Sequence, residues 1–246
     1  MVEREMAHVP QGSVPVPAKI AEIAGDDAVD GVWRNQLGGL TFRLRGQEAT
    51  RYAKWQSYSG LNPERKEHVN LSVEAEKLSW AGQFARVPSV LEQGAEGDAA
   101  WLITEGINAP SAADPRWRDA PEAAVRAIAT GLRRLHDALP VDECSYQGSW
   151  LGAKATTAPA PERLVVCHGD PCVPNTLIDE DGGFAGHVDL AQLGVADLWA
   201  DLAIATYSIS WQVNFGHNYD DLFFDTYGVQ PDYERIHAYR KLWDAE

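Results

Sequence analysis

The chain has little cysteine, no long apolar run and fewer basic than acidic residues. Its three cysteines, Cys144, Cys167 and Cys172, are few and odd in number, which favours free thiols over a disulfide framework. No run of about 18 apolar residues is present, so we expect no membrane span and no membrane partner. The first residues, MVEREMAHVPQ, lack the apolar stretch of a secretory signal. We therefore expect a cytoplasmic protein.

The shortage of basic residues gives the chain a strongly negative charge. Lys and Arg number 21 and Asp and Glu number 36, so the net charge at pH 7 is -15. Such a charge repels phosphate backbones, and nucleic acid is not expected as a partner. The same charge attracts a cationic small molecule. Acidity that only keeps the protein soluble is the open alternative.

The pattern of apolar residues changes between the two parts of the chain. Before residue 106 it predicts mainly strands, two within 32–46 and others at 51–58, 87–94 and 99–106, with helices at 18–25 and 73–85. After residue 106 it predicts helices at 120–139, 199–212, 219–227 and 232–244, with an irregular connector at 145–162. This change predicts an α+β protein of two lobes with a cleft between them, 1–106 and 107–246.

Residues 165–179, VVCHGDPCVPNTLID, place several polar groups directly after an apolar run. Strands at 176–179 and 184–188 around the turn EDGG predict a hairpin that brings Asn175 opposite Asp189. Two oxygen ligands side by side suit Mg²⁺, and the nearby Asp170 can accept a proton from a hydroxyl. This spacing is typical of phosphoryl transfer, although HGD alone is common and often only forms turns.

A zinc site is the alternative for the same segment. Cys167, His168, Cys172 and His187 lie near one another in sequence. Their spacing matches no structural zinc pattern, and cysteines beside an apolar strand are more often small buried residues. We therefore do not expect zinc.

Several motifs together resemble a known family. In chain order they are RYAKW with Lys54, VEAEKLSW with Glu74, LITEG, GLRRLHDALPVDEC, VVCHGDPCVPN and GHVDLAQLGVADLWADLA. This set, from about residue 32 to the C-terminus, resembles the aminoglycoside phosphotransferases of the 3'- and 3''-types, small-molecule relatives of protein kinases. The resemblance implies a two-lobed, protein-kinase-like α+β fold. Its small N-terminal antiparallel sheet lobe, 1–106, would bind nucleotide, and its larger, mainly helical lobe, 107–246, would carry catalysis and the acceptor.

The resemblance implies roles in the C-terminal lobe. Asp170 would be the base for the attacking hydroxyl, and Asn175 and Asp189 would hold Mg²⁺. His168 and Asp201 would support the catalytic loop rather than touch substrate. Asp201 at a helix start also suits an ordinary N-terminal charge.

In the N-terminal lobe the resemblance implies contacts with ATP or GTP. Lys54 would hold the α- and β-phosphates and pair with Glu74, and Tyr52 would stack on the base. Backbone groups of Thr104 and Gly106 would bond the base edge, and N–H groups of Gly38 and Gly39 would cradle the phosphates. The open alternatives are that Lys54 is a solvated residue on its strand, that Glu74 is exposed on its helix, and that Tyr52 packs in the core of the lobe.

The chain departs from the family pattern at three places. The glycine-rich segment QLGGLTF has no small polar residue beside its glycines, and Ala191-Gln192 replaces the usual Gly-Arg. Only 23 residues, 145–167, separate Cys144 from His168, where relatives have a longer helical segment that binds the aminoglycoside. At the C-terminus, Asp244 and Glu246 stand where relatives have acidic substrate contacts.

These observations predict an ATP- or GTP-dependent and Mg²⁺-dependent phosphotransferase. Its acceptor would be a hydroxyl of a cationic small molecule, an aminoglycoside or similar amino sugar, as in antibiotic-resistance enzymes. The shortened acceptor segment and the missing Arg leave open a nucleotide-binding protein with little or no catalysis. A kinase for choline, an amino acid or a sugar is a third reading.

Overall fold

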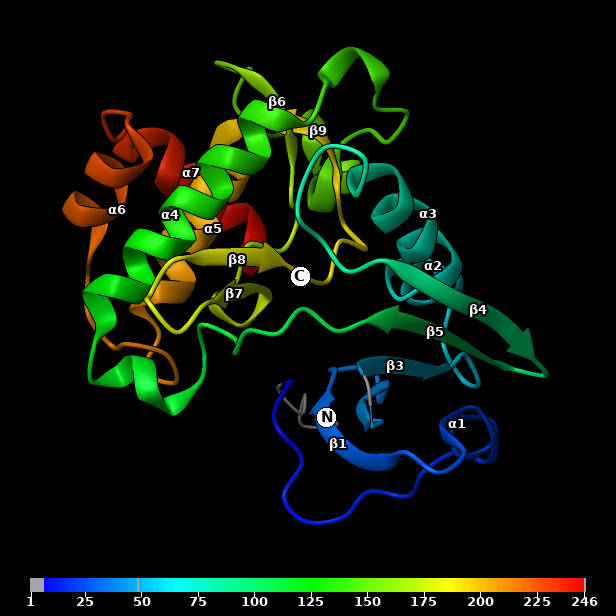
Figure 1. The fold of residues 1–246 in the computed structure, drawn as a ribbon. Coiled ribbons are helices and arrows are strands. Elements are labelled where there is room, and N and C mark those ends of the chain that lie inside the picture. The colour runs from blue at the N-terminus through cyan, green and yellow to red at the C-terminus, as the bar shows by residue number, and fades with distance from the viewer. Residues whose placement is uncertain (1–6, 48, 246) are drawn as a thin grey trace. The chain divides into compact units, whose positions relative to one another are not determined.

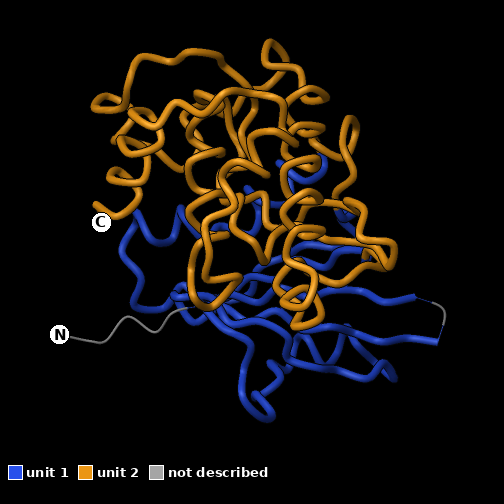
Figure 2. The backbone as a smooth tube through the Cα atoms, turned by 90° about the vertical axis from the view of Figure 1, so that its left-hand side faces the viewer, with its two compact units in different colours: residues 1–79, 88–106 blue, residues 80–87, 107–246 orange. Residues whose placement is uncertain are grey.

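A computed structural model describes residues 7–47 and 49–245 of the chain. The chain divides into two units, residues 1–79 with 88–106 and residues 80–87 with 107–246 (Figure 2). Residues 80–87 thus pack with the second unit although they precede residue 106. Which unit binds nucleotide and which binds the acceptor stays a prediction.

A five-stranded sheet with the order β1-β2-β3-β5-β4 dominates the first unit (Figure 1). Each neighbouring pair of strands is antiparallel. The strands are β1 (Ala28–Arg34), β2 (Leu40–Arg45), β3 (Thr50–Ser57), β4 (Val90–Glu96) and β5 (Ala99–Glu105). The strands predicted from the sequence are confirmed, although β1 begins before residue 32.

The core of this unit lies between the sheet and α1 (Ala18–Ala24). The alternating pattern of β2 buries Leu40, Phe42 and Leu44 in it. On β3, Ala53 faces the same core. Because successive side chains of a strand point to opposite faces, Lys54 lies on the other face of the sheet.

Two helices connect β3 to β4, namely α2 (Pro63–His68) and α3 (Leu71–Ala81). The predicted helix at 73–85 is α3, which begins earlier because the Asn70 side chain accepts the N–H of Ser72. Helix α2 is not predicted by the sequence pattern, because it buries no residue and therefore has no apolar periodicity.

Four helices form most of the second unit (Figure 1). They are α4 (Pro121–Ala138), α5 (Leu198–Ser210), α6 (Asp220–Tyr227) and α7 (Tyr233–Asp244), all predicted from the sequence. Helix α4 packs against α6, and α5 packs against α7. Helix α5 is buried along almost its whole length, so polar residues on it must find partners inside the unit.

Two small antiparallel sheets hold the loops of the predicted site. One pairs β6 (Leu164–Cys167) with β9 (Gly194–Asp197), and the other pairs β7 (Thr176–Ile178) with β8 (Phe184–His187). The predicted hairpin is therefore confirmed, whereas β9 was missed because GVAD is too short to show a strand pattern.

The connector at 145–162 is largely irregular, as expected. It contains a kinked 3₁₀ helix (Ser149–Thr156), from which the Trp150 indole donates a hydrogen bond to the Ala200 carbonyl. The Trp150 ring also packs edge-on against Trp243 of α7. Within 7–47 and 49–245, no helix combines the length and the apolar character that crossing a membrane requires.

Candidate active site

Asp201 on α5 holds the loop that contains the HGD motif. The carboxylate accepts the backbone N–H of His168 at 2.6 Å through Oδ2 and that of Gly169 at 3.1 Å through Oδ1. Asp201 and His168 are both completely buried. Since buried N–H groups need an acceptor, Asp201 fixes the course of this loop.

His136 of α4 supports the same carboxylate from the other side. Its Nε2 lies 3.0 Å from Asp201 Oδ2, and its Nδ1 lies 2.8 Å from the Tyr227 hydroxyl oxygen. Burial alone would raise the pKa of Asp201, but the hydrogen bond and charge of His136 hold it below its usual range. Asp201 is therefore ionised at neutral pH.

The structure does not assemble the four residues considered for zinc. Among the described residues, the cluster with metal-ligating spacing is instead His136, Cys167 and Asp201. Both ring nitrogens of His136 and both oxygens of Asp201 already have hydrogen-bond partners. Burial also raises the pKa of the Cys167 thiol, which keeps it protonated. This cluster therefore braces the loop.

Position 169 is the one position of the HGD motif that only glycine can occupy. Its φ is +90°, and a Cβ there would lie 2.0 Å from the carbonyl oxygen of Gln192. Any other residue would be strained and would also clash with the backbone. The HGD loop thus packs directly on the segment that follows Asp189.

Asp170 is half-buried in this loop. Its N–H donates to His168 Nδ1 at 3.3 Å, while its side-chain Oδ1 is buried and has no hydrogen-bond partner among the described residues. Burial, and then the negative charge of Asp189, raise the pKa of Asp170 above its usual range. An orphaned carboxylate oxygen with increased proton affinity suits a group that accepts a proton from a ligand.

The hairpin brings Asn175 and Asp189 together, with a small correction to the predicted register. Thr176 pairs with His187, and the Val188 N–H donates to the Asn175 carbonyl at 3.0 Å. Asn175 is therefore opposite Val188, one residue before Asp189. The irregularity between Leu177 and Ile178, where β8 carries an extra residue, sets this register, because without it Asn175 would lie opposite His187.

The side chains at this position fit a magnesium ion. The Asn175 Nδ2 donates to the Asp170 carbonyl at 2.9 Å, which leaves the carboxamide oxygen as the atom for a cation. Asp189 has a φ of +64°, a conformation that non-glycine residues adopt at a cost of about 1–3 kcal/mol and often at functional sites. The negative charge of Asp189 contributes to the raised pKa of Asp170, and a divalent cation would offset this repulsion between the two carboxylates.

In the first unit, Lys54 and Glu74 form an ion pair. The Lys54 Nζ lies 2.6 Å from Glu74 Oε1, and the Glu74 side chain is 3% exposed. The pair joins β3 to α3 and fixes the position of the ammonium group. Its role toward nucleotide phosphates stays a prediction.

Comparison with known proteins identifies the family. A model of the phosphotransferase enzyme family matches residues 147–239. An aminoglycoside 3'-phosphotransferase of Streptomyces ribosidificus is 31% identical over 242 aligned residues, which cover 83% of this chain and 90% of the relative. The chain belongs to the aminoglycoside phosphotransferase family. A streptomycin 3''-kinase of Streptomyces griseus is 29% identical over 81% of the chain and 86% of its own length.

Solved structures agree with this assignment. An aminoglycoside-3'-phosphotransferase of type VIII has a TM-score of 0.71 at 25% identity, over 88% of this chain and 92% of that one. The APH(3'')-Id enzyme of Streptomyces rimosus has a TM-score of 0.69 at 24% identity, over 91% and 94%. The α+β, kinase-like fold expected from the sequence is confirmed, and the chain is a phosphotransferase enzyme.

The residues predicted to contact the nucleotide base in this phosphotransferase lie on adjacent strands. Tyr52 of β3 pairs with Thr104 of β5. The Gly106 N–H donates to the Thr50 carbonyl at 2.8 Å, so only the carbonyl of Gly106 is left for a ligand. Binding of the base by these three residues stays a prediction.

The turn that contains Gly38 and Gly39 differs from the predicted phosphate cradle. The Gly38 N–H donates to the Asn35 carbonyl, and the Gly39 N–H donates to Asn35 Oδ1 at 2.7 Å. Asn35 also donates to Gln56 Oε1 at 3.0 Å. In this conformation both glycine N–H groups already donate to oxygen atoms of Asn35, so neither is available to a phosphate. Phosphate binding here would require the turn to open.

The predicted acceptor residues lie at the end of α7. Asp244 is exposed and accepts a hydrogen bond from the Tyr207 hydroxyl at 3.2 Å. The guanidinium of Arg240 lies 5.3 Å from the centre of the Tyr207 ring. Glu246 lies outside the described residues.

Two residues that organise the site, His136 and Asn35, were not predicted from the sequence. His136 continues the apolar stripe of α4, four residues after Leu132, and a histidine on a buried stripe was the signal for it. No feature of the sequence indicated the role of Asn35, because an Asn before glycines is typical of an ordinary turn.

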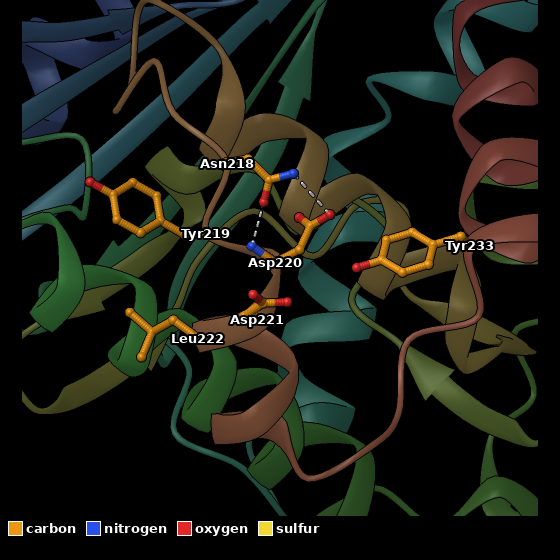
Figure 3. A pocket seen from close by; sticks show the side chains of 6 residues that line it. All are labelled: Asn218, Tyr219, Asp220, Asp221, Leu222 and Tyr233. Carbon is orange, nitrogen blue, oxygen red and sulfur yellow. Dashed lines mark hydrogen bonds between the residues drawn. The ribbon is translucent and has the colours of Figure 1, made fainter.

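The pocket in Figure 3 is separate from these residues. It has a volume of about 490 Å³ at the start of α6 and is lined by Asn218, Tyr219, Asp220, Asp221, Leu222 and Tyr233. Its polar groups pair with one another, since Asn218 accepts the Asp220 N–H and donates to its carboxylate. It contains none of the predicted site residues.

Proposed function

We propose that the chain transfers the terminal phosphate of ATP or GTP, with Mg²⁺, to a hydroxyl of an aminoglycoside. The observation that carries the proposal is the arrangement of Asp170, Asn175 and Asp189 around one hairpin end. The similar proteins support the acceptor class, since they are named as aminoglycoside 3'-phosphotransferases and a streptomycin 3''-kinase. One similar structure contains ADP and streptomycin. The acidic charge of this chain suits a polycationic acceptor.

The residues would divide the reaction between them. The acceptor oxygen forms a bond to the terminal phosphorus, the bond from that phosphorus to the bridging oxygen breaks, and the acceptor proton passes to the carboxylate of Asp170. Asn175 and Asp189 would hold Mg²⁺, which supplies charge neutralisation on the phosphates. Lys54, fixed by Glu74, would hold the α- and β-phosphates.

At the acceptor end, Asp244 would bind an ammonium group. The Tyr207 hydroxyl already orients the Asp244 carboxylate, and the exposed position leaves room for a ligand. Glu246 would add a second acidic contact, and His168 and Asp201 would keep the loop in place without touching substrate.

A radiolabelled-phosphate assay over a panel of aminoglycosides tests the function. We expect transfer to acceptors that carry the reactive hydroxyl, and none to a matched acceptor from which only that hydroxyl is missing. Asp244→Ala should raise the KM for the acceptor several-fold and leave the KM for nucleotide unchanged, because it removes one exposed charge contact. Failure of the wild-type protein to label any member of the panel would refute an aminoglycoside acceptor.

The alternative of nucleotide binding without transfer is motivated by Ala191-Gln192 and the short connector. The same panel, extended to choline, amino acids and sugars, separates it from another kinase activity. A thermal shift with ATP and Mg²⁺, combined with no labelled product from any acceptor, would favour this alternative.

Lys54→Met should separate nucleotide binding from folding. We expect kcat/KM for nucleotide to fall by about 10- to 100-fold, since hydrogen bonds to charged groups contribute about 1.5–3 kcal/mol each. Because Glu74 is almost fully buried, the variant should also be less stable, and adding Glu74→Gln should restore stability but not activity. Steady-state kinetics and thermal denaturation of both variants measure this. Full activity of Lys54→Met would contradict the assigned role.

A further inference from the structure

Helix α5 contacts the HGD loop at a second place besides Asp201. The Val173 N–H donates to the side-chain oxygen of Ser208 at 3.0 Å, across 35 residues of sequence. Both residues are completely buried, so water cannot replace this acceptor. The loop is thus attached to α5 on both sides of Asp170, through Asp201 before it and through Ser208 after it.

Asn214, just beyond α5, fixes the orientation of the Ser208 hydroxyl. Its Nδ2 donates to Ser208 Oγ at 3.1 Å and to the Ser208 carbonyl at 2.8 Å. The hydroxyl oxygen therefore accepts two hydrogen bonds, from Val173 and from Asn214. A hydroxyl has two acceptor positions and one proton, so its proton must point to another group.

Cys172, which directly precedes Val173 in the loop, is the neighbouring group that could receive this proton. Burial, and then the neighbouring Asp170 and Ser208 side chains, shift the pKa of the Cys172 thiol, which is raised overall, so both side chains lie beside the thiol. A carboxylate only accepts hydrogen bonds, so in such an arrangement the thiol would donate to Asp170 and its sulfur would accept from Ser208. A directed series of hydrogen bonds would then run from Asn214 through Ser208 and Cys172 to Asp170, whose Oδ1 has no partner among the described residues.

We propose that Ser208 is a positioning residue for phosphoryl transfer, which acts through Cys172 to orient the carboxylate of Asp170 toward the acceptor hydroxyl. The inference rests on the proposed role of Asp170 as the base. Ser208 touches neither nucleotide nor acceptor in this proposal. Its effect should appear in kcat, because a small misplacement of a reacting group lowers the rate more than the binding of substrate.

Ser208→Ala and Ser210→Ala form a matched pair for the test. Both change a serine of the last turns of α5, but the Ser210 hydroxyl donates only to the Tyr207 carbonyl of its own helix. We expect Ser208→Ala to lower kcat by about 10- to 100-fold with the KM for nucleotide unchanged. Ser210→Ala should keep both constants within about twofold. Thermal denaturation of each variant accompanies the kinetics.

A second pair keeps the test decisive if Ser208→Ala does not fold. Cys172→Ser retains a donor for Asp170, whereas Cys172→Ala removes it. The serine variant should exceed the alanine variant in kcat by about tenfold or more. Equal kcat values for these two variants, or wild-type kcat in Ser208→Ala, would overturn the inference. If the wild-type protein transfers phosphate to no acceptor, the proposed function itself fails, and this inference fails with it.

Discussion

Asp170→Asn is expected to abolish phosphoryl transfer while the protein still binds nucleotide. The asparagine has nearly the same shape but cannot accept the acceptor proton, and general base catalysis contributes about 10²- to 10⁴-fold to rate. The orphaned Oδ1 and the raised pKa of Asp170 both indicate that this carboxylate is arranged to receive a proton. Single-turnover assays measure transfer, and a thermal shift with nucleotide measures binding.

Asp181→Asn is the matched control for that substitution. Asp181 is exposed in the turn between β7 and β8, so the control makes the same chemical change in the same hairpin. We expect wild-type activity from it. Turnover near that of the wild type in Asp170→Asn would exclude Asp170 as the base.

Asp201→Ala is expected to cause the largest loss of stability among the residues around the loop. It removes the acceptor of two buried N–H groups and the partner of the His136 ring. Loss of one partner from a buried charge network typically costs about 3–5 kcal/mol. For a chain of this length, that corresponds to a fall in the melting temperature on the order of 10 °C. Calorimetry of the variant against wild type measures it.

The pH dependence of this difference has a defined sign. The pKa of Asp201 is held below the usual value of about 3.9, so its contribution is present in full above that pH and is lost as the pH falls below it. The stability gap between wild type and Asp201→Ala should therefore shrink in acid. Asp225→Ala, an exposed change on α6, should alter stability by less than about 0.5 kcal/mol. A gap of similar size for both variants at neutral pH would show that Asp201 has no special role.

Much of the site could be predicted from the sequence because its residues lie close together along the chain. The spacing of Asp170, Asn175 and Asp189 follows from one loop and one short hairpin, and hairpins are specified by local turn residues. The apolar repeat of α4 likewise predicted its buried face, because helical periodicity is a local property.

What the sequence by itself determined is the order of the elements and the set of polar residues at the hairpin end. Tertiary structure alone decided which partners those residues meet, since Asp201 reaches His168 across 33 residues and Ser208 reaches Val173 across 35. It also decided that Asn35 occupies the amides of Gly38 and Gly39, and that an extra residue in β8 places Asn175 opposite Val188. The physical reason is that a buried polar group forms hydrogen bonds with whichever partner the packing of the chain brings within reach. The periodicity of residues along the chain does not indicate which partner that is.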